Sequence, residues 1–155
     1  SGIYHFSRAA ANVLVVLRKL DHAMIYVLIA GTYTPLLLGL LPAPRAEVFT
    51  AVIWGVALAG IVMKLCWINA PRWLGTTLYL LLGWAIAIDL PALAALPVPA
   101  VALLAAGGLL YTAGGLIYMI KRPNLSERFG FHEIFHLFVI AGSLCHYFLV
   151  LLYIA

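Results

Sequence analysis

The chain has 155 residues, of which 66% are hydrophobic and only 9% are charged, and its formal net charge is +4. In soluble domains about a quarter of all residues are charged, so this composition excludes a soluble globular protein. The basic residues lie between apolar runs and form no stripe with interleaved aromatics, which argues against nucleic acid as a partner. We expect one all-α domain over residues 1–155, a polytopic membrane helical bundle whose partners are membrane lipids.

The first eleven residues are predicted to form the end of a membrane span. Residues 1–11 are mostly apolar and lack the charged start of a signal peptide. We therefore expect this span to begin upstream of Ser1, so that the chain is an N-terminally truncated piece. Arg8 would mark the point at which the span leaves the hydrocarbon.

Five further apolar stretches are long enough, or nearly so, to cross a bilayer. A spanning helix needs about 20 apolar residues, because the hydrocarbon core is about 30 Å thick and each residue rises about 1.5 Å. Strands are excluded because lipid does not tolerate open sheet edges and the stretches lack the alternation of a barrel. The expected spans, of which the third is the shortest, cover about residues 21–41, 47–67, 74–90, 98–120 and 132–154.

The basic residues in the connections predict the orientation. In this topology eight of the nine Lys and Arg residues lie on one side of the membrane, and Arg45 alone lies on the other. The eight residues that share a side are Arg8, Arg18, Lys19, Lys64, Arg72, Lys121, Arg122 and Arg128. Because positive residues are retained in the cytoplasm, we expect the segment before Asp21 inside and the C-terminus outside. The Ala- and Leu-rich composition favours a bacterial inner membrane.

Two histidines at the start of the last expected span carry the clearest chemical signal. His132 and His136 are four residues apart, which places both imidazoles on one helix face, about one turn apart. This spacing suits two ligands of one metal ion. The alternative is a pair of interfacial side chains that extend to the membrane surface beside Arg128.

The topology adds His5, which lies near the cytoplasmic end of the partial first span and thus at the depth of His132 and His136. Three imidazoles with one open position are the pattern of a catalytic zinc site. Asp21 opens the next expected span from the same side. It is either an acid in the first helical turn, favoured by the helix dipole, or a carboxylate that holds a metal-bound water or orients a ligand.

The stretch from His132 to His136 also matches the H-E-x-x-H signature of zinc metalloproteases, in which the glutamate is the general base. An intramembrane protease is therefore a competing hypothesis. His5, a third ligand from the opposite end of the chain, favours a different zinc site. Glu133 is then an interfacial acid, because adjacent helical residues point about 100° apart, although it stays an alternative base.

Four segments together resemble a known membrane family. They are Ser1 and His5 in an S-x-x-x-H pattern, LRKLDHAMIYVLIAGTYTP from Leu17 to Pro35, Gly83-Trp84, and HEIFHLFVIAGSLCH from His132 to His146. The chain resembles the hemolysin III group of the progestin and adipoQ receptor superfamily, which includes the adiponectin receptors. The resemblance implies a seven-span fold of which this chain lacks the first span and the start of the second.

The resemblance also implies the roles of the site residues. It implies Zn²⁺ held by His5, His132 and His136, with Asp21 near the metal water and Ser1 beside it as catalytic residues. Related receptors are thought to be ceramidase-like hydrolases, which implies a zinc-dependent hydrolase of lipid-like amides. The family name is associated with lysis, so a receptor-like, pore-forming or cytolytic protein with structural zinc is the non-enzymatic alternative.

Two further histidines and a set of glycines receive simpler interpretations. We expect neither His22 nor His146 to bind the metal, since His146 lies roughly 15 Å beyond His136 along the helix. The glycine pairs at 107–108 and 114–115 repeat every seven residues, which predicts close packing of membrane helices.

Overall fold

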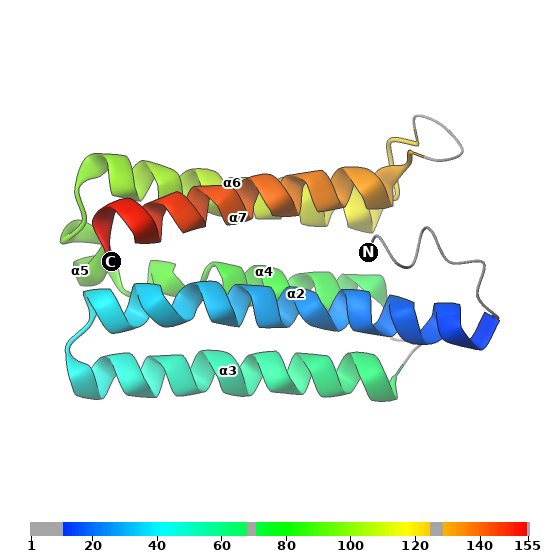
Figure 1. Ribbon diagram of the computed structural model, residues 1–155, viewed down its shortest axis with the longest axis horizontal. Helices are drawn as coiled ribbons and strands as arrows, with labels where there is room; N and C mark the ends of the chain where they lie inside the picture. Colours follow the sequence, from blue (N-terminus) through cyan, green and yellow to red (C-terminus); the bar gives the residue numbers. More distant parts are fainter. Residues whose placement is uncertain (1–10, 68–70, 125–128, 155) are drawn as a thin grey trace.

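The computed structural model describes residues 11–67, 71–124 and 129–154, and all regular elements in these ranges are helical. They are α2 (Ala11–Leu40), α3 (Ala43–Cys66), α4 (Arg72–Gly83), the 3-10 helix η1 (Ala85–Ile88), α5 (Leu90–Ala94), α6 (Val98–Ile120) and α7 (Phe131–Tyr153). The long helices run side by side along the length of the molecule (Figure 1). The predicted fold class, an all-α membrane helical bundle, is confirmed.

Among the described residues, four helices are long and apolar enough to cross a membrane. They are Val15–Leu40, Ala43–Cys66, Val98–Ile120 and Phe131–Tyr153, and each overlaps one expected span. Their outward side chains include many exposed large apolar groups, such as Val48 and Leu58 of α3 and Leu152 of α7. Lipid would cover this surface, because no soluble domain exposes so much contiguous apolar area.

Helix α2 begins earlier than expected, and this changes the position of Asp21. The helix starts at Ala11 rather than near Asp21 and continues to Leu40. No glycine or proline interrupts residues 11–30, so the polar stretch around Lys19 stays helical. Asp21 therefore lies inside the helix, and the interpretation of this residue as a first-turn acid stabilised by the helix dipole is wrong.

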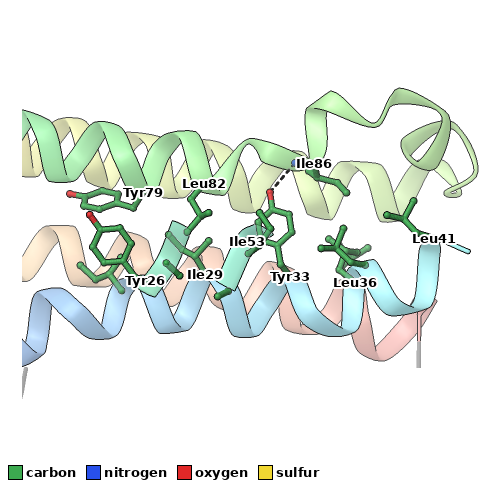
Figure 2. Packing of buried hydrophobic residues seen from close by; sticks show 14 of the residues in the cluster. Tyr26, Ile29, Tyr33, Leu36, Leu41, Ile53, Tyr79, Leu82 and Ile86 are labelled. Atoms are coloured by element: carbon green, nitrogen blue, oxygen red, sulfur yellow. Dashed lines mark hydrogen bonds between the residues drawn. The ribbon is translucent and has the colours of Figure 1, made fainter. Parts of the chain in front are cut away.

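The third expected span, residues 74–90, is not one continuous helix. Helix α4 ends at Gly83, and the chain continues as η1. Tyr33 of α2 holds this break: its hydroxyl donates to the Gly83 carbonyl (2.6 Å) and accepts from the Ile86 N–H (3.1 Å), as the dashed line in Figure 2 shows for Ile86. Broken helices are tolerated at membrane depth where neighbouring side chains satisfy the freed backbone groups.

We expect Tyr33→Phe to lower the free energy of unfolding by about 1–3 kcal/mol, because it leaves two backbone groups at a buried helix break without their partner. Reversible unfolding in mixed micelles measures the effect. Tyr153→Phe, at an exposed site near the end of α7, is the matched control and should change stability by less than about 0.5 kcal/mol. Equal stability of Tyr33→Phe and the wild type would contradict this role for the hydroxyl.

The helices form two closely packed pairs. Helix α2 packs chiefly on α3, and α6 packs chiefly on α7, while α4 contacts α2, α3 and α6 (Figure 1). The buried core of the first pair includes Tyr26 and Ile29 of α2, which lie against Tyr79 and Leu82 of α4 (Figure 2). Direct contact between α2 and α7 is slight. The positions of these two helices therefore depend on the ties between the pairs.

The two ends of the bundle differ in charge. Lys19 of α2, Lys64 of α3 and Lys121 after α6 lie at the end where α7 begins (Figure 1). Arg45 lies at the opposite end, where it forms a 2.9 Å ion pair with the buried carboxylate of Asp89. The structure thus places these four described basic residues at the ends that the expected topology gives them, while the orientation in the membrane stays a prediction.

Candidate metal centre

Asp21 of α2 lies against His132 and His136 of α7 at the basic end of the bundle. The Oδ2 atom of Asp21 is 3.4 Å from Nε2 of each imidazole, and the two Nε2 atoms are 3.2 Å apart. The carboxylate is 8% exposed and the imidazoles 20% and 21%, so the group is largely shielded from solvent. Within the described residues, these three side chains form a group of potential ligands close enough to share one metal ion.

Local sequence explains how α7 presents the two histidines. The helix begins at Phe131, and its first two turns place His132 and His136 one above the other on the face toward α2. Glu133 does not join them: its Oε2 accepts a hydrogen bond from the Gly130 N–H (2.9 Å), which satisfies one of the free donors at the helix start. The glutamate of the H-E-x-x-H motif is therefore a helix-capping residue in the structure.

With an ionised Asp21, hydrogen bonds satisfy at most two of the three contacts between these atoms. Each Nε2 carries either one proton or one lone pair, and a carboxylate oxygen only accepts. If both imidazoles donate to Asp21, two N–H groups face one another at 3.2 Å. If one Nε2 is unprotonated, it accepts a hydrogen bond from the other Nε2, and its contact with the carboxylate oxygen then joins two acceptors. A cation between the three atoms would attract all three lone pairs at once.

The spacing of the three atoms also fits a tetrahedral ion. Zinc bonds of about 2.0–2.1 Å to nitrogen and oxygen place neighbouring ligand atoms about 3.3 Å apart in a tetrahedron. The observed separations are 3.2 and 3.4 Å. Two imidazoles and one carboxylate are a donor set that zinc accepts. The two imidazoles therefore fit two positions of such a site, and the carboxylate oxygen lies close to both of them.

Two of the predicted site residues cannot be placed. His5, predicted as a metal ligand, and Ser1, predicted as a catalytic residue, lie outside the described residues, so their roles stay predictions. The structure brings together the other three, His132, His136 and Asp21, although they come from helices far apart in the sequence. The Oδ2 atom of Asp21 is 3.4 Å from each Nε2 atom, and the two Nε2 atoms are 3.2 Å apart. The three atoms are therefore almost equally spaced.

Sequence reasoning missed one residue beside the centre. Tyr118, in the last turns of α6, is hydrogen-bonded through its hydroxyl to Nε2 of His22 at 2.5 Å. The His22 ring stacks on the His132 ring, with centroids 6.1 Å apart. His22 does not belong to the group of potential ligands among the described residues. Tyr118 belongs to no motif, and only its depth in the bundle could have indicated its position.

A crevice of about 470 Å³ lies between α2 and α7. Its walls are mostly apolar and include four polar side chains, one from α2 and three from α7. It is lined by Val27, Leu28, Gly31, Thr32, Pro35, Ser143, His146, Tyr147 and Val150. Val27 is six residues beyond Asp21 in the same helix, about 9 Å along the axis. The crevice therefore begins about 9 Å from Asp21 along α2 and extends away from the metal centre.

Comparison with known proteins identifies relatives of this chain. Residues 1–147 match the family described as "Haemolysin-III related". The chain is 40% identical over 139 residues to the "Hemolysin-3 homolog" of Bacillus subtilis (strain 168), which covers 89% of this chain and 63% of that protein. It is 39% identical over 136 residues to "Hemolysin-3" of Bacillus cereus, with coverages of 87% and 60%. The chain thus spans about three fifths of the length of these relatives. No solved structure matches it significantly.

Proposed function

Because the chain belongs to the haemolysin III-related family, we propose that it is an integral membrane protein with a zinc-dependent activity on lipid-like amides. In this proposal His132, His136 and His5 hold one Zn²⁺, and Asp21 lies beside the ion. The observation that carries the proposal is the triangle of Oδ2 and two Nε2 atoms, with sides of 3.2–3.4 Å. The two Nε2 atoms lie at the spacing of two ligands of one zinc ion, and Oδ2 lies close enough to accept a proton from a water on that ion.

Amide hydrolysis adds water across the C–N bond and gives a carboxylic acid and an amine. Bound zinc supplies Lewis acidity, which polarises the amide carbonyl and lowers the pKa of water. His132 and His136 bind and orient the ion through Nε2. The Oδ2 atom of Asp21 accepts the proton of the attacking water and returns it to the leaving amine, a role that requires this oxygen to lie at the metal centre.

The proposed substrate class follows from the surroundings of the centre. The α2–α7 crevice is largely apolar, and its volume of about 470 Å³ suits part of a long hydrocarbon chain. Its nearest wall lies about 9 Å along α2 from Asp21, so an amide at the end of such a chain would be near the metal. Lys19 and Lys64 at the same end support a cytoplasmic position, because positive residues are retained inside.

The second candidate function is a non-enzymatic one. The names of the two Bacillus relatives, "Hemolysin-3" and its homolog, favour a lytic protein. In such a protein the zinc would be structural. A structural site needs four protein ligands and no open position. Asp21 as a direct fourth ligand beside His5, His132 and His136 would close the site in this way. The protease alternative is disfavoured, because Glu133 caps the start of α7.

The two candidates differ in turnover of a lipid amide. We expect the purified chain in liposomes to hydrolyse a fluorescent long-chain N-acyl amine, and Asp21→Asn to lower the rate about 100-fold or more at zinc concentrations that fill both proteins. Glu47→Gln, an exposed carboxylate at the opposite end, is the matched control and should keep the wild-type rate.

Equal rates of the wild type and Asp21→Asn, or no turnover by either, would contradict the hydrolase. Release of a dye from the same liposomes by the wild type, without turnover, would support the lytic alternative.

A further inference from the structure

A polar contact joins the two helix pairs directly beside the candidate metal centre. Nε2 of His22 in α2 and the hydroxyl of Tyr118 in α6 are hydrogen-bonded at 2.5 Å, although 96 residues separate them in the sequence. His22 follows Asp21 in the chain, so the bond fixes α2 at the residue next to the carboxylate. It is therefore a tie between α2 and the α6–α7 pair at the level of the metal centre.

The same two side chains also contact His132. The His22 ring stacks on the His132 ring at a centroid distance of 6.1 Å and an interplanar angle of 28°. The Tyr118 ring lies 6.1 Å from His132 and 5.2 Å from Phe135, and its own side chain is almost fully buried. Both members of the hydrogen bond therefore lie against the imidazole of a candidate metal ligand.

The residues of the centre come from two different helix pairs, so a contact between the pairs is needed to hold them together. Asp21 belongs to the α2–α3 pair, whereas His132 and His136 belong to the α6–α7 pair, and α2 touches α7 only slightly. The proposed role of Asp21 requires its carboxylate to lie within hydrogen-bond reach of a water at the metal centre. A relative movement of the two pairs would separate the carboxylate from the imidazoles, so groups around the ligands must fix their positions.

We propose that His22 and Tyr118 are positioning residues of the metal centre. Their hydrogen bond sets the distance between Asp21 and the histidines of α7, and their rings fix the orientation of the His132 imidazole, while neither residue binds the ion. This inference rests on the proposed metal site, and it adds two residues that act through the ligands rather than on the substrate.

The test is the affinity and visible spectrum of Co²⁺ bound by the purified chain in detergent. Tyr118→Phe and His22→Phe keep a ring at each position and remove the hydrogen bond. We expect each to weaken Co²⁺ binding about 10–100-fold and to alter the d–d bands, since outer partners of metal ligands have effects of this size. The double variant should be no weaker than the single ones, because both remove the same bond.

Tyr111→Phe is the matched control. It removes a hydroxyl of the same helix that is hydrogen-bonded to Ser143 at 2.9 Å, away from the metal centre. We expect it to leave the affinity and the spectrum unchanged. His22→Gln, which can still hydrogen-bond to the Tyr118 hydroxyl, should recover much of the lost affinity, which a general defect in folding would not predict.

The outcomes separate the two proposals. No Co²⁺ binding by the wild type would overturn the metal site itself, and the positioning role with it. Wild-type binding with equal affinity in Tyr118→Phe and His22→Phe would overturn the positioning role alone. An equal loss in Tyr111→Phe, or no recovery in His22→Gln, would also overturn it, because the effect would then reflect general packing.

Discussion

Replacement of His136 by alanine is expected to reduce the zinc in the purified protein from about one ion per chain to almost none. The variant removes one corner of the triangle formed by Asp21, His132 and His136. Loss of an outer partner of a ligand already weakens binding 10–100-fold, so loss of a ligand should weaken it by more than about 100-fold. Elemental analysis of protein purified without chelators measures the effect.

The matched control for this experiment is His146→Ala. His146 lies on the same helix, roughly 15 Å from His136, and its Nε2 faces the Leu104 carbonyl at 3.4 Å rather than the metal centre. We expect this variant to keep its zinc. A wild type without zinc, or a His136→Ala variant with as much zinc as the wild type, would exclude the proposed site.

The second large effect is expected for Gly142→Leu in α7, which should lower the free energy of unfolding by more than about 3 kcal/mol. Even a Cβ atom at this position would lie 2.8 Å from the Tyr111 ring and 3.1 Å from the backbone carbonyl of Gly107. A backbone atom cannot move aside as a side chain can, so α6 and α7 must separate. Insertion of single methylene groups into a packed core already costs typically 1–3 kcal/mol.

Gly55→Leu in α3 is the matched control, because a Cβ at Gly55 would meet no atom within 4 Å. Its free energy of unfolding, measured in the same mixed micelles, should stay within about 1 kcal/mol of the wild type. Similar losses in both variants would contradict the role of the α6–α7 contact, because a change from glycine to leucine by itself favours the helix.

The close approach of α6 and α7 could be predicted from the sequence. The glycine pairs at 107–108 and 114–115 repeat along one helix, and the structure buries all four glycines of α6. Gly142 of α7, which faces Gly107, belongs to no such repeat. The repeat is a local pattern within one helix. Which residue of α7 lies against it depends on how the two helices are aligned.

The break in α4 could not be predicted in the same way. Residues 74–90 are mostly apolar, with Thr76, Thr77 and Asp89 as the polar exceptions, and hydropathy does not distinguish a straight helix from a broken one. Tyr33 decides the outcome, because its hydroxyl satisfies the Gly83 carbonyl and the Ile86 N–H. This partner lies 50 residues earlier in the chain, so the information is tertiary.

The sequence by itself determined the membrane class, the all-α fold and the two histidines four residues apart. These features depend on composition and on the 3.6-residue period of the helix, which act over a few residues. Only the tertiary structure decided the position of Asp21. The sequence alone is also compatible with an acid in the first helical turn, whereas α2 begins at Ala11 and places Asp21 inside the helix. The His22–Tyr118 bond likewise joins α2 to α6 only in the folded bundle, because a centre shared between helices exists only where folding brings them together.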